Sequence, residues 1–494
     1  MRKNELGIIG LLAALKLVIQ FFGNVNYGFH RDELLHLSVS EHLDFGYMEF
    51  PPFIAVLGKL SFVFFDYSLF GMRLFPTLAG VLILVVCCLM AKELGGKWRA
   101  LLFAGTCVLA FLPFYRNHTL FQPVAFDQLF WTAGFYFLIR FINSNDKKDL
   151  LLTGFALGLG LQNKYTMLIW AFGIVVGLIF YRRGELFKNR WLYFSGLVAL
   201  LVFLPNLIWQ FQHDFPLLKH AQALSQYQLS ENGYADFVLD QLTMPAISIT
   251  SVIGLWWLLR NESFRWIAVS VVVIFFTMLL TKSKSYYVFP IYPVLFAAGG
   301  VQLEAWLRKK RSFWAYIVAS SIFLPFIPWI PELTPVLSIE RFVQYQGLEE
   351  NNGRIELTSD YADMFGWNEQ VALVDSVYRS LSPKEKRNCV LWAENYGEAG
   401  ALKILGKRYG LPNPISRHGS FWLWGHGNKN ADVWISLGNE KPSVEHTFEE
   451  VTLVKIIYHK YAIDEENGIP LYICRKPKVD IEKWWSDYAD HVFD

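Results

Sequence analysis

The sequence is dominated by long apolar runs without a charged residue, such as GVLILVVCCLM at residues 80–90 and IAVSVVVIFFTMLL at residues 267–280. Because charged groups are costly in hydrocarbon, such runs are typical of helices that cross a membrane. The runs stop near residue 330, and from about Pro335 the charge density rises to that of soluble proteins. We therefore expect a polytopic membrane protein followed by a soluble tail.

Composition agrees with this interpretation. Of the 494 residues, 53% are hydrophobic, 17% are aromatic and only 18% are charged, and the mean hydropathy is +0.28. Soluble domains carry about 25% charged residues, so the low share of charged residues and the apolar excess indicate a membrane protein. The basic residues lie in short loops, which argues against a nucleic-acid-binding protein.

Eleven membrane spans are predicted from the apolar runs. They cover residues 6–23, 71–91, 100–115, 124–142, 150–162, 165–181, 191–210, 243–259, 264–281, 286–305 and 313–330. A helix needs about 20 residues to cross the hydrocarbon, so the limits of the short 150–162 span are soft.

Alternate loops between these spans are basic, with Lys and Arg near residues 2–3, 92–99, 147–148, 182–190, 260–265 and 308–311. Basic loops stay in the cytoplasm, so with an odd number of spans we expect a cytoplasmic N-terminus and an extracytoplasmic tail. The first apolar run lacks a small-residue cleavage site. We therefore expect it to remain as a span rather than to be removed as a signal peptide.

The tail alternates short β-like runs with a helical pattern at about 396–408, which predicts a small α/β domain. The β-like runs are NCVLWA, ADVWISL, VTLVKIIY and PLYICRK. The expected division is a transmembrane domain over residues 1–334 and an extracytoplasmic α/β domain over residues 335–494. Oxidation is allowed outside the cell, so Cys389 and Cys474 could form a disulfide or stay free.

The loop after the first span is unusually rich in charge for a segment beside hydrocarbon. In GFHRDELLHLSVSEHLDFGYMEFPPF, residues 28–53, apolar residues recur at helical spacing over 32–43, and Asp32 and Glu33 fall between them. This pattern predicts an amphipathic helix in the membrane interface. The prolines of EFPPF interrupt it, and residues 53–65 predict a second interfacial or re-entrant helix.

On the predicted topology, polar residues of five outer segments collect at one membrane face. They are Asp32, Glu33 and Glu49; Arg116, Asn117, His118 and Asp127; Gln162, Asn163 and Lys164; His213, Asp214, Lys219 and His220; and Lys282, Lys284, Tyr286 and Tyr287. Singly, each has an ordinary explanation: the lysines could reach lipid headgroups, Asp32 could cap a helix, and Asp127 could interact with a helix dipole. Together they predict a functional site.

Group transfer on the outer face has to work without ATP or a nucleotide-activated substrate. A lipid phosphate that carries a sugar arrives there already activated. Its phosphate leaving group needs cations to hold the growing negative charge, and a hydroxyl acceptor needs a carboxylate base. The predicted site offers both. Glu33 and His36 are spaced so that they could share a metal ion, and the need for a divalent cation as cofactor stays open.

Four blocks of the sequence resemble one family. HRDELLHLSVSEHLDFGYMEFPPFIAVLGKL, QPVAFDQLFW, GLGLQNKYTML and LTKSKSYYVFPIYPVLFAAGG look like the corresponding blocks of the GT-C glycosyltransferases that use polyprenyl-phosphate sugars. These include the protein O-mannosyltransferases and the bacterial lipid A aminoarabinose transferases. The resemblance covers essentially the whole membrane part. It implies a bacterial inner-membrane enzyme with a polyprenyl-phosphate-sugar donor and a glycolipid, glycan or protein acceptor.

The resemblance also implies roles for individual residues. Asp32 matches the catalytic base that activates the acceptor in an inverting displacement, and Glu33 is its supporting neighbour. The residues implied for the donor and its phosphate are Glu49, Asp127, Lys164, His220, Lys282, Lys284 and Tyr286, of which His220 is the loosest match. Phe50 stands where the aminoarabinose transferases have a phosphate-binding lysine, which argues against that particular sugar.

The main alternative is a secondary transporter or lipid flippase. Such proteins bind substrate near the bilayer midplane on broken helices arranged as repeats. Here the polar residues collect at one surface, and no internal repeat is visible. A receptor or scaffold on a membrane anchor would not need so many spans. In the tail, Trp392, Tyr396, Trp422 and Trp424 are equally compatible with sugar stacking and with a hydrophobic core.

Overall fold

The computed structural model describes residues 2–229, 232–242 and 245–493, and it divides into two compact units. Unit 1 comprises Met1–Asn24, Phe50–Phe53 and Arg73–Val336, and unit 2 comprises Val25–Glu49, Ile54–Met72 and Leu337–Asp494. The first loop is thus part of the same unit as the tail. The boundary between domains at residues 334 and 335 stays a prediction.

The described residues of unit 1 form helices without a sheet. The α-helices are α1 (Lys3–Gly23), α4 (Leu69–Glu93), α5 (Trp98–Ala110), α6 (Pro113–Thr119), α7 (Pro123–Ser144), α8 (Lys147–Leu161), α9 (Met167–Ile179), α10 (Arg190–Gln212), α11 (Pro216–Leu224), α12 (Tyr234–Asp240), α13 (Pro245–Arg260), α14 (Arg265–Leu280), α15 (Tyr292–Leu307), α16 (Phe313–Phe323) and α17 (Ile330–Leu333). Short 3-10 helices are η1 (Arg182–Lys188), η3 (Ser285–Ile291) and η4 (Leu324–Trp329), and η2 (Ser225–Leu229) is a π-helix.

Each of the eleven predicted spans coincides with helix in the described residues. Among those residues, five helices are long and apolar enough to cross a membrane: α1, α4, α10, Ser285–Leu307 and Phe313–Leu333. The pair α5 and α6, bent by 69°, makes a sixth if it is one broken span. A helical membrane part is therefore confirmed, whereas the number eleven stays a prediction.

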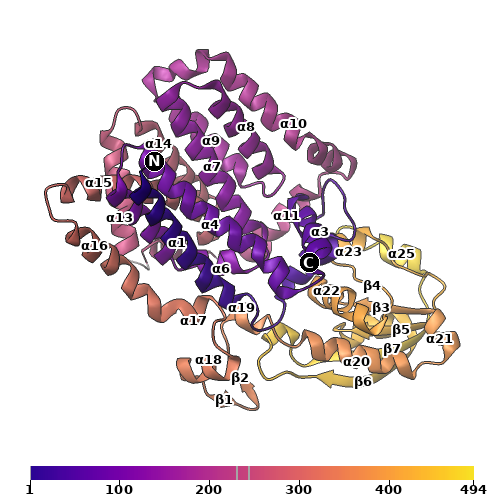
Figure 1. Ribbon diagram of the computed structural model, residues 1–494. Helices are drawn as coiled ribbons and strands as arrows, with labels where there is room; N and C mark the ends of the chain where they lie inside the picture. The colour runs from indigo at the N-terminus through magenta and orange to yellow at the C-terminus, as the bar shows by residue number, and fades with distance from the viewer. Residues whose placement is uncertain (1, 230–231, 243–244, 494) are drawn as a thin grey trace. The chain divides into compact units, whose positions relative to one another are not determined.

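Small residues bring the helices of unit 1 close together. α8 and α10 lie side by side (Figure 1), and a Cβ built on Gly154 of α8 would fall 2.1 Å from the carbonyl oxygen of Ser195 on α10. Glycine at such interfaces lets two backbones approach, as in membrane helix pairs. The other side of α10 leaves Leu201 and Phe211 exposed at 58% and 73%, as expected for a helix that faces lipid.

Unit 2 contains a five-stranded mixed sheet of order β4-β3-β5-β7-β6. The strands are β3 (Cys389–Ala393), β4 (Pro414–Ile415), β5 (Val433–Leu437), β6 (Phe448–Ile457) and β7 (Ile469–Pro477), and a small ribbon is formed by β1 (Glu350–Asn351) and β2 (Arg354–Ile355). β4, β3 and β5 run parallel, while β7 pairs antiparallel with both β5 and β6. The small α/β domain predicted from the tail is confirmed.

The tail also contains helices, and α20 and α22 lie against the sheet (Figure 1). The tail helices are α18 (Ile339–Gln346), α19 (Ser359–Ala362), α20 (Trp367–Ser380), α21 (Pro383–Arg387), α22 (Tyr396–Leu405), α23 (Gly419–Leu423), α24 (Lys441–Thr447) and α25 (Ile481–Ser486), with the 3-10 turns η5 (Gly406–Tyr409) and η6 (Asp464–Glu466). α22 follows β3 and packs against β3 and β4. The hydrophobic core on the other face of the sheet contains Trp392, Trp434 and Phe448. All five cysteines are free, and β5 separates the strands that carry Cys389 and Cys474.

The first loop adds α2 (Arg31–Val39) and α3 (Phe53–Phe65) to unit 2. α2 packs on α22, where a Cβ built on Gly400 would lie 2.9 Å from the Cβ of Leu34. The polar side of α2 is covered as well, because Glu33, His36 and Ser40 are buried. α3 instead keeps an exposed apolar side that includes Val63 and Phe64.

Candidate functional site

The predicted site residues divide between the two units. Unit 2 holds Asp32, Glu33 and Glu49, and unit 1 holds Asp127, Lys164, His220, Lys282, Lys284 and Tyr286. The expectation that all of them line one cavity stays a prediction.

The start of α2 is fixed by a capping box. The backbone N–H of Asp32 donates to Nδ1 of His30 at 3.1 Å, and the backbone N–H of His30 donates to Oε2 of Glu33 at 2.9 Å. These bonds satisfy N–H groups that a helix start would otherwise leave unpaired. Glu33 therefore has a structural task in this fold, whereas capping does not use the carboxylate of Asp32.

The carboxylate of Asp32 contacts the tail. The hydroxyl of Tyr396, the first residue of α22, donates to Oδ1 of Asp32 at 3.0 Å. Burial, and then the nearby negative charge of Asp32, raises the pKa of Tyr396 well above its usual value. The phenol therefore keeps its proton and acts as a hydrogen-bond donor to Asp32.

Further acidic side chains surround this pair. Arg31 forms ion pairs with Asp363 at 3.1 Å and with Glu465 at 2.7 Å, and lies 3.9 Å from buried Glu466. Burial raises the pKa of Asp363 and brings that of Glu466 to about 7. Several carboxyls thus share one guanidinium, so part of the cluster is protonated near neutral pH.

Glu49, the second acid of the loop, is held by the start of α23. Its Oε1 accepts the backbone N–H of Ser420 at 2.7 Å, and its Oε2 accepts the Ser420 hydroxyl at 2.5 Å. Burial raises the pKa of Glu49, and the hydrogen bonds from Ser420 oppose that shift. Gly419 is required here, because its φ is +52° and a Cβ would collide with Oε1 of Glu49.

In unit 1, Asp127 lies just after the first turn of α7 with both carboxylate oxygens in use. Oδ1 accepts the indole N–H of Trp131 at 3.0 Å, and Oδ2 accepts the hydroxyl of Thr166 at 2.8 Å. Lys164, two residues before Thr166, interacts electrostatically with Asp127. Asp127 therefore positions the connection between α8 and α9 that carries this lysine.

The ammonium group of Lys164 lies over two aromatic rings, 4.0 Å from the ring centre of Tyr287 and 5.5 Å from that of Tyr286. Such cation–π contacts hold a cation in place without neutralising it. Asp127, Lys164 and Tyr286 are thus brought together although they lie far apart in the chain, and their role in donor binding stays a prediction.

The remaining predicted cations of unit 1 belong to two other segments of the chain. Lys282 and Lys284 come just before η3, the helix that contains Tyr286. The carbonyl of Lys282 accepts the side-chain amide of Asn232 at 3.0 Å. His220 lies half-buried on α11.

Three features of the sites were not predicted from the sequence. Tyr396 and Ser420 bind the two loop acids from more than 360 residues away, and no local pattern signals such contacts. Lys16 does carry a signal, because it is a lysine inside the apolar helix α1. It is fully buried, 4.3 Å from the ring centre of Tyr115.

The tail aromatics have different surroundings, and two of the four belong to the hydrophobic core. Trp392 is fully buried in the sheet core, and Trp422 packs against that core. Trp424 instead stacks on His42 of the first loop with ring centres 4.2 Å apart, and Tyr396 contacts Asp32. Among the described residues, no group of three His, Cys, Asp or Glu side chains could hold a metal ion.

Comparison with known proteins supports the architecture. Residues 49–209 match the family model of dolichyl-phosphate-mannose-protein mannosyltransferases. No curated protein matches the sequence.

Solved structures match over most of the chain. ArnT from Cupriavidus metallidurans in the apo state is 13% identical with a TM-score of 0.61, and ArnT bound to undecaprenyl phosphate is 12% identical with a TM-score of 0.62. Both matches cover 94% of this chain and 98% of ArnT. The arabinofuranosyltransferase AftD from Mycobacteria is 12% identical with a TM-score of 0.53, over 94% of this chain and 41% of AftD. The matches to ArnT confirm the fold class predicted from the sequence.

Proposed function

We propose that this multi-pass membrane protein, which has the fold of the GT-C glycosyltransferases, transfers a sugar from a polyprenyl-phosphate donor. The observation that carries the proposal is the likeness over 94% of the chain to ArnT bound to undecaprenyl phosphate. The family model over residues 49–209, named for a dolichyl-phosphate sugar donor, supports the same class of substrate.

In the proposed reaction an acceptor oxygen attacks the anomeric carbon of the donor sugar. The bond between that carbon and the phosphate oxygen breaks, and polyprenyl phosphate leaves with the bonding electron pair. Asp32 takes the proton of the acceptor hydroxyl, and Tyr396 orients its carboxylate. Attack opposite the leaving group inverts the anomeric centre.

The cations of unit 1 have the complementary role in this proposal. Lys164, Lys282 and Lys284 stabilise the negative charge that grows on the leaving phosphate. Asp127 and Tyr286 hold Lys164 in place. Glu49 and His220 are assigned to the donor sugar.

The acceptor is a glycolipid, a glycan or a protein at the outer face of a bacterial cytoplasmic membrane. We assign residues 1–334 to the transmembrane catalytic domain with a cytoplasmic N-terminus, and residues 335–494 to the extracytoplasmic domain. One feature supports this topology: α2 of the first loop packs on α22 of the tail. Both segments must then lie on the same side of the membrane, so the chain between them crosses it an even number of times.

The proposal is tested with purified full-length protein in lipid nanodiscs and a panel of polyprenyl-phosphate sugars. Total lipids and glycans of the native host serve as acceptors, and release of polyprenyl phosphate is measured. We expect one donor to be consumed in an acceptor-dependent way. If no donor of the panel releases polyprenyl phosphate under any acceptor condition, the proposed function is wrong.

A further inference from the structure

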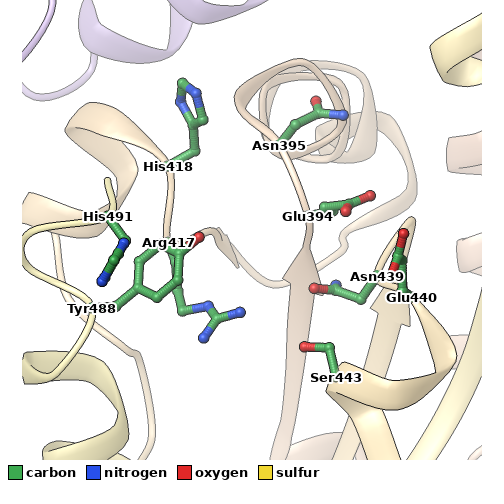
Figure 2. A pocket seen from close by; sticks show the side chains of 9 residues that line it. All are labelled: Glu394, Asn395, Arg417, His418, Asn439, Glu440, Ser443, Tyr488 and His491. Carbon is green, nitrogen blue, oxygen red and sulfur yellow. The ribbon is translucent and has the colours of Figure 1, made fainter. Parts of the chain in front are cut away.

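Unit 2 contains a polar pocket of about 300 Å³ at the carboxyl ends of its three parallel strands. Glu394 follows β3, Arg417 comes two residues after β4, and Glu440 comes three residues after β5. Figure 2 shows Glu394 and Glu440 on one side of the pocket and Arg417 with Tyr488 on the other.

The topology of the sheet explains why a pocket forms at this place. After β3 the chain passes through α22 to β4 on one side, and after β5 it passes through α24 to β6 and β7 on the other side. The connections therefore diverge from the neighbouring ends of β3 and β5 and leave a crevice between them. In open α/β sheets such a switch point is where ligands bind.

The lining is mixed in charge. Arg417 stacks over aromatic rings, with its guanidinium carbon 4.0 Å from the ring centre of Tyr488 and 4.6 Å from that of Trp484. Arg417 and Glu394 attract each other electrostatically, while Glu440 opposes the ionisation of Glu394. A guanidinium has five N–H donors and a carboxylate has two acceptor oxygens, so both groups keep hydrogen-bonding capacity for a ligand.

These side chains select the class of ligand. Two carboxylates accept hydrogen bonds, while Arg417 and the hydroxyl of Ser443 donate them. A phosphate would face two carboxylates, with Arg417 as the one permanent cation of the lining beside the titratable His418 and His491. An apolar ligand would leave the polar groups without partners. A neutral ligand with several hydroxyl groups can donate to the acids and accept from the guanidinium, as a sugar does.

The pocket shares its walls with the segments that hold the two loop acids. Asn395 caps α22 with its side chain, and the next residue, Tyr396, donates to Asp32. The ring of His418 lies 4.9 Å from that of Tyr396. Two residues further on, Ser420 binds Glu49. All these contacts belong to unit 2.

We propose that this pocket binds a neutral, hydroxyl-rich sugar unit of the acceptor. The sugar class follows from the pocket, and its assignment to the acceptor rests on the proposed glycosyl transfer. The tail domain then brings the acceptor to Asp32 through the same two segments that line the pocket.

The experiment measures binding of methyl glycosides of neutral hexoses and pentoses to the full-length protein by saturation-transfer NMR, with inorganic phosphate in a separate arm. Glu394→Gln and Glu440→Gln are compared with Glu482→Gln, an exposed acid of the same domain that does not line the pocket. We expect at least one glycoside to bind, with its Kd raised about tenfold by either pocket variant through the loss of a charge-assisted hydrogen bond. The Glu482→Gln protein should bind like the wild type.

Three results overturn the sugar site: no glycoside binds, phosphate binds in place of glycosides, or the pocket variants bind like the wild type. The assignment to the acceptor falls if Glu394→Gln loses glycoside binding but keeps its KM for acceptor in the transfer assay. A wild type that binds glycosides but releases no polyprenyl phosphate supports the sugar site and contradicts the proposed function. The two proposals can therefore fail separately.

Discussion

The carboxylates of Asp32 in unit 2 and Asp127 in unit 1 have opposite surroundings. Asp127 is buried and has a protein donor on each oxygen, Trp131 on one and Thr166 on the other. Asp32 is half-buried, accepts a hydrogen bond from the hydroxyl of Tyr396, and lies near other acidic side chains. A carboxylate bonded on both oxygens is suited to positioning its neighbours, whereas a more accessible one can exchange a proton with substrate. We therefore expect the proton acceptor in unit 2 and the positive charge for the phosphate in unit 1.

The largest expected effect is that of Asp32→Asn. Loss of a general base costs about 10²- to 10⁴-fold in rate, so we expect kcat for sugar transfer to fall about 10³-fold while polyprenyl-phosphate binding stays within about twofold. Asp127→Asn should lose less, about tenfold, because an amide still accepts one of the two hydrogen bonds. Steady-state release of polyprenyl phosphate gives both numbers.

Asp44→Asn is the matched control for Asp32→Asn, because Asp44 is an exposed acid of the same loop. It should transfer at the wild-type rate. An Asp127→Asn protein that is more impaired than Asp32→Asn would reverse the comparison and remove Asp32 from the role of base.

The next effect concerns Lys164. Removal of one preorganised charge donor from a transition state costs about 10²-fold, so Lys164→Met should lower kcat/KM for the donor by about this factor, and Lys164→Arg should recover part of the loss. Lys147→Met is the control, because Lys147 also lies over an aromatic ring, 4.8 Å from the centre of Trp191, but in a predicted cytoplasmic loop. Equal losses in both methionine variants would mean that only the cation–π contact matters.

Tyr396→Phe tests whether the tail tunes Asp32. It removes one hydrogen bond to the carboxylate, so we expect kcat to fall about tenfold or less. Because that bond favours the charged form of the carboxylate, the acidic limb of the kcat profile should move to higher pH. A Tyr396→Phe protein with lower kcat but an unshifted profile would assign Tyr396 a packing role only.

Much of the fold could be predicted from the sequence because its signals are local. Apolar runs mark the membrane helices, and short β-like runs separated by polar segments mark β3, β5, β6 and β7. The number of spans is harder, since α5 and α6 are divided by a bend of 69° at Pro113. A short apolar helix can be part of a span, an interfacial helix or a buried helix of a core.

The candidate site could be predicted only in part, for a related reason. Asp127, Lys164 and Tyr286 lie at helix ends that the predicted topology places on one face, and the fold brings them together. Partners from the tail have no such signal: Tyr396 and Ser420 reach Asp32 and Glu49 through tertiary packing. The position of the tail pocket likewise depends on strand order, which the β-like runs alone do not give.

The smallest expected effect separates catalytic acids of unit 2 from structural ones. Glu398 is fully buried on α22, accepts the backbone N–H of Glu394 at 2.9 Å, and has its pKa raised well above 4.5 by burial and then by Glu466. A carboxyl that holds its proton more tightly in the folded state leaves the unfolding free energy unchanged below about pH 4.5 and lowers it as the pH rises above that value. Glu398→Gln mimics the protonated acid and removes this dependence. Between pH 5 and pH 8, the melting temperature of Glu398→Gln should therefore rise by a few degrees relative to that of the wild type. Tryptophan fluorescence of the full-length protein measures this difference.

Glu385→Gln is the control, because the pKa of Glu385 is shifted in the opposite direction: hydrogen bonds from Ser382 lower it to about 2. Its difference from the wild type is lost only as the pH falls below 4.5, and so should stay constant from pH 5 to pH 8. A constant difference for Glu398→Gln as well would mean that Glu398 is charged in the folded protein.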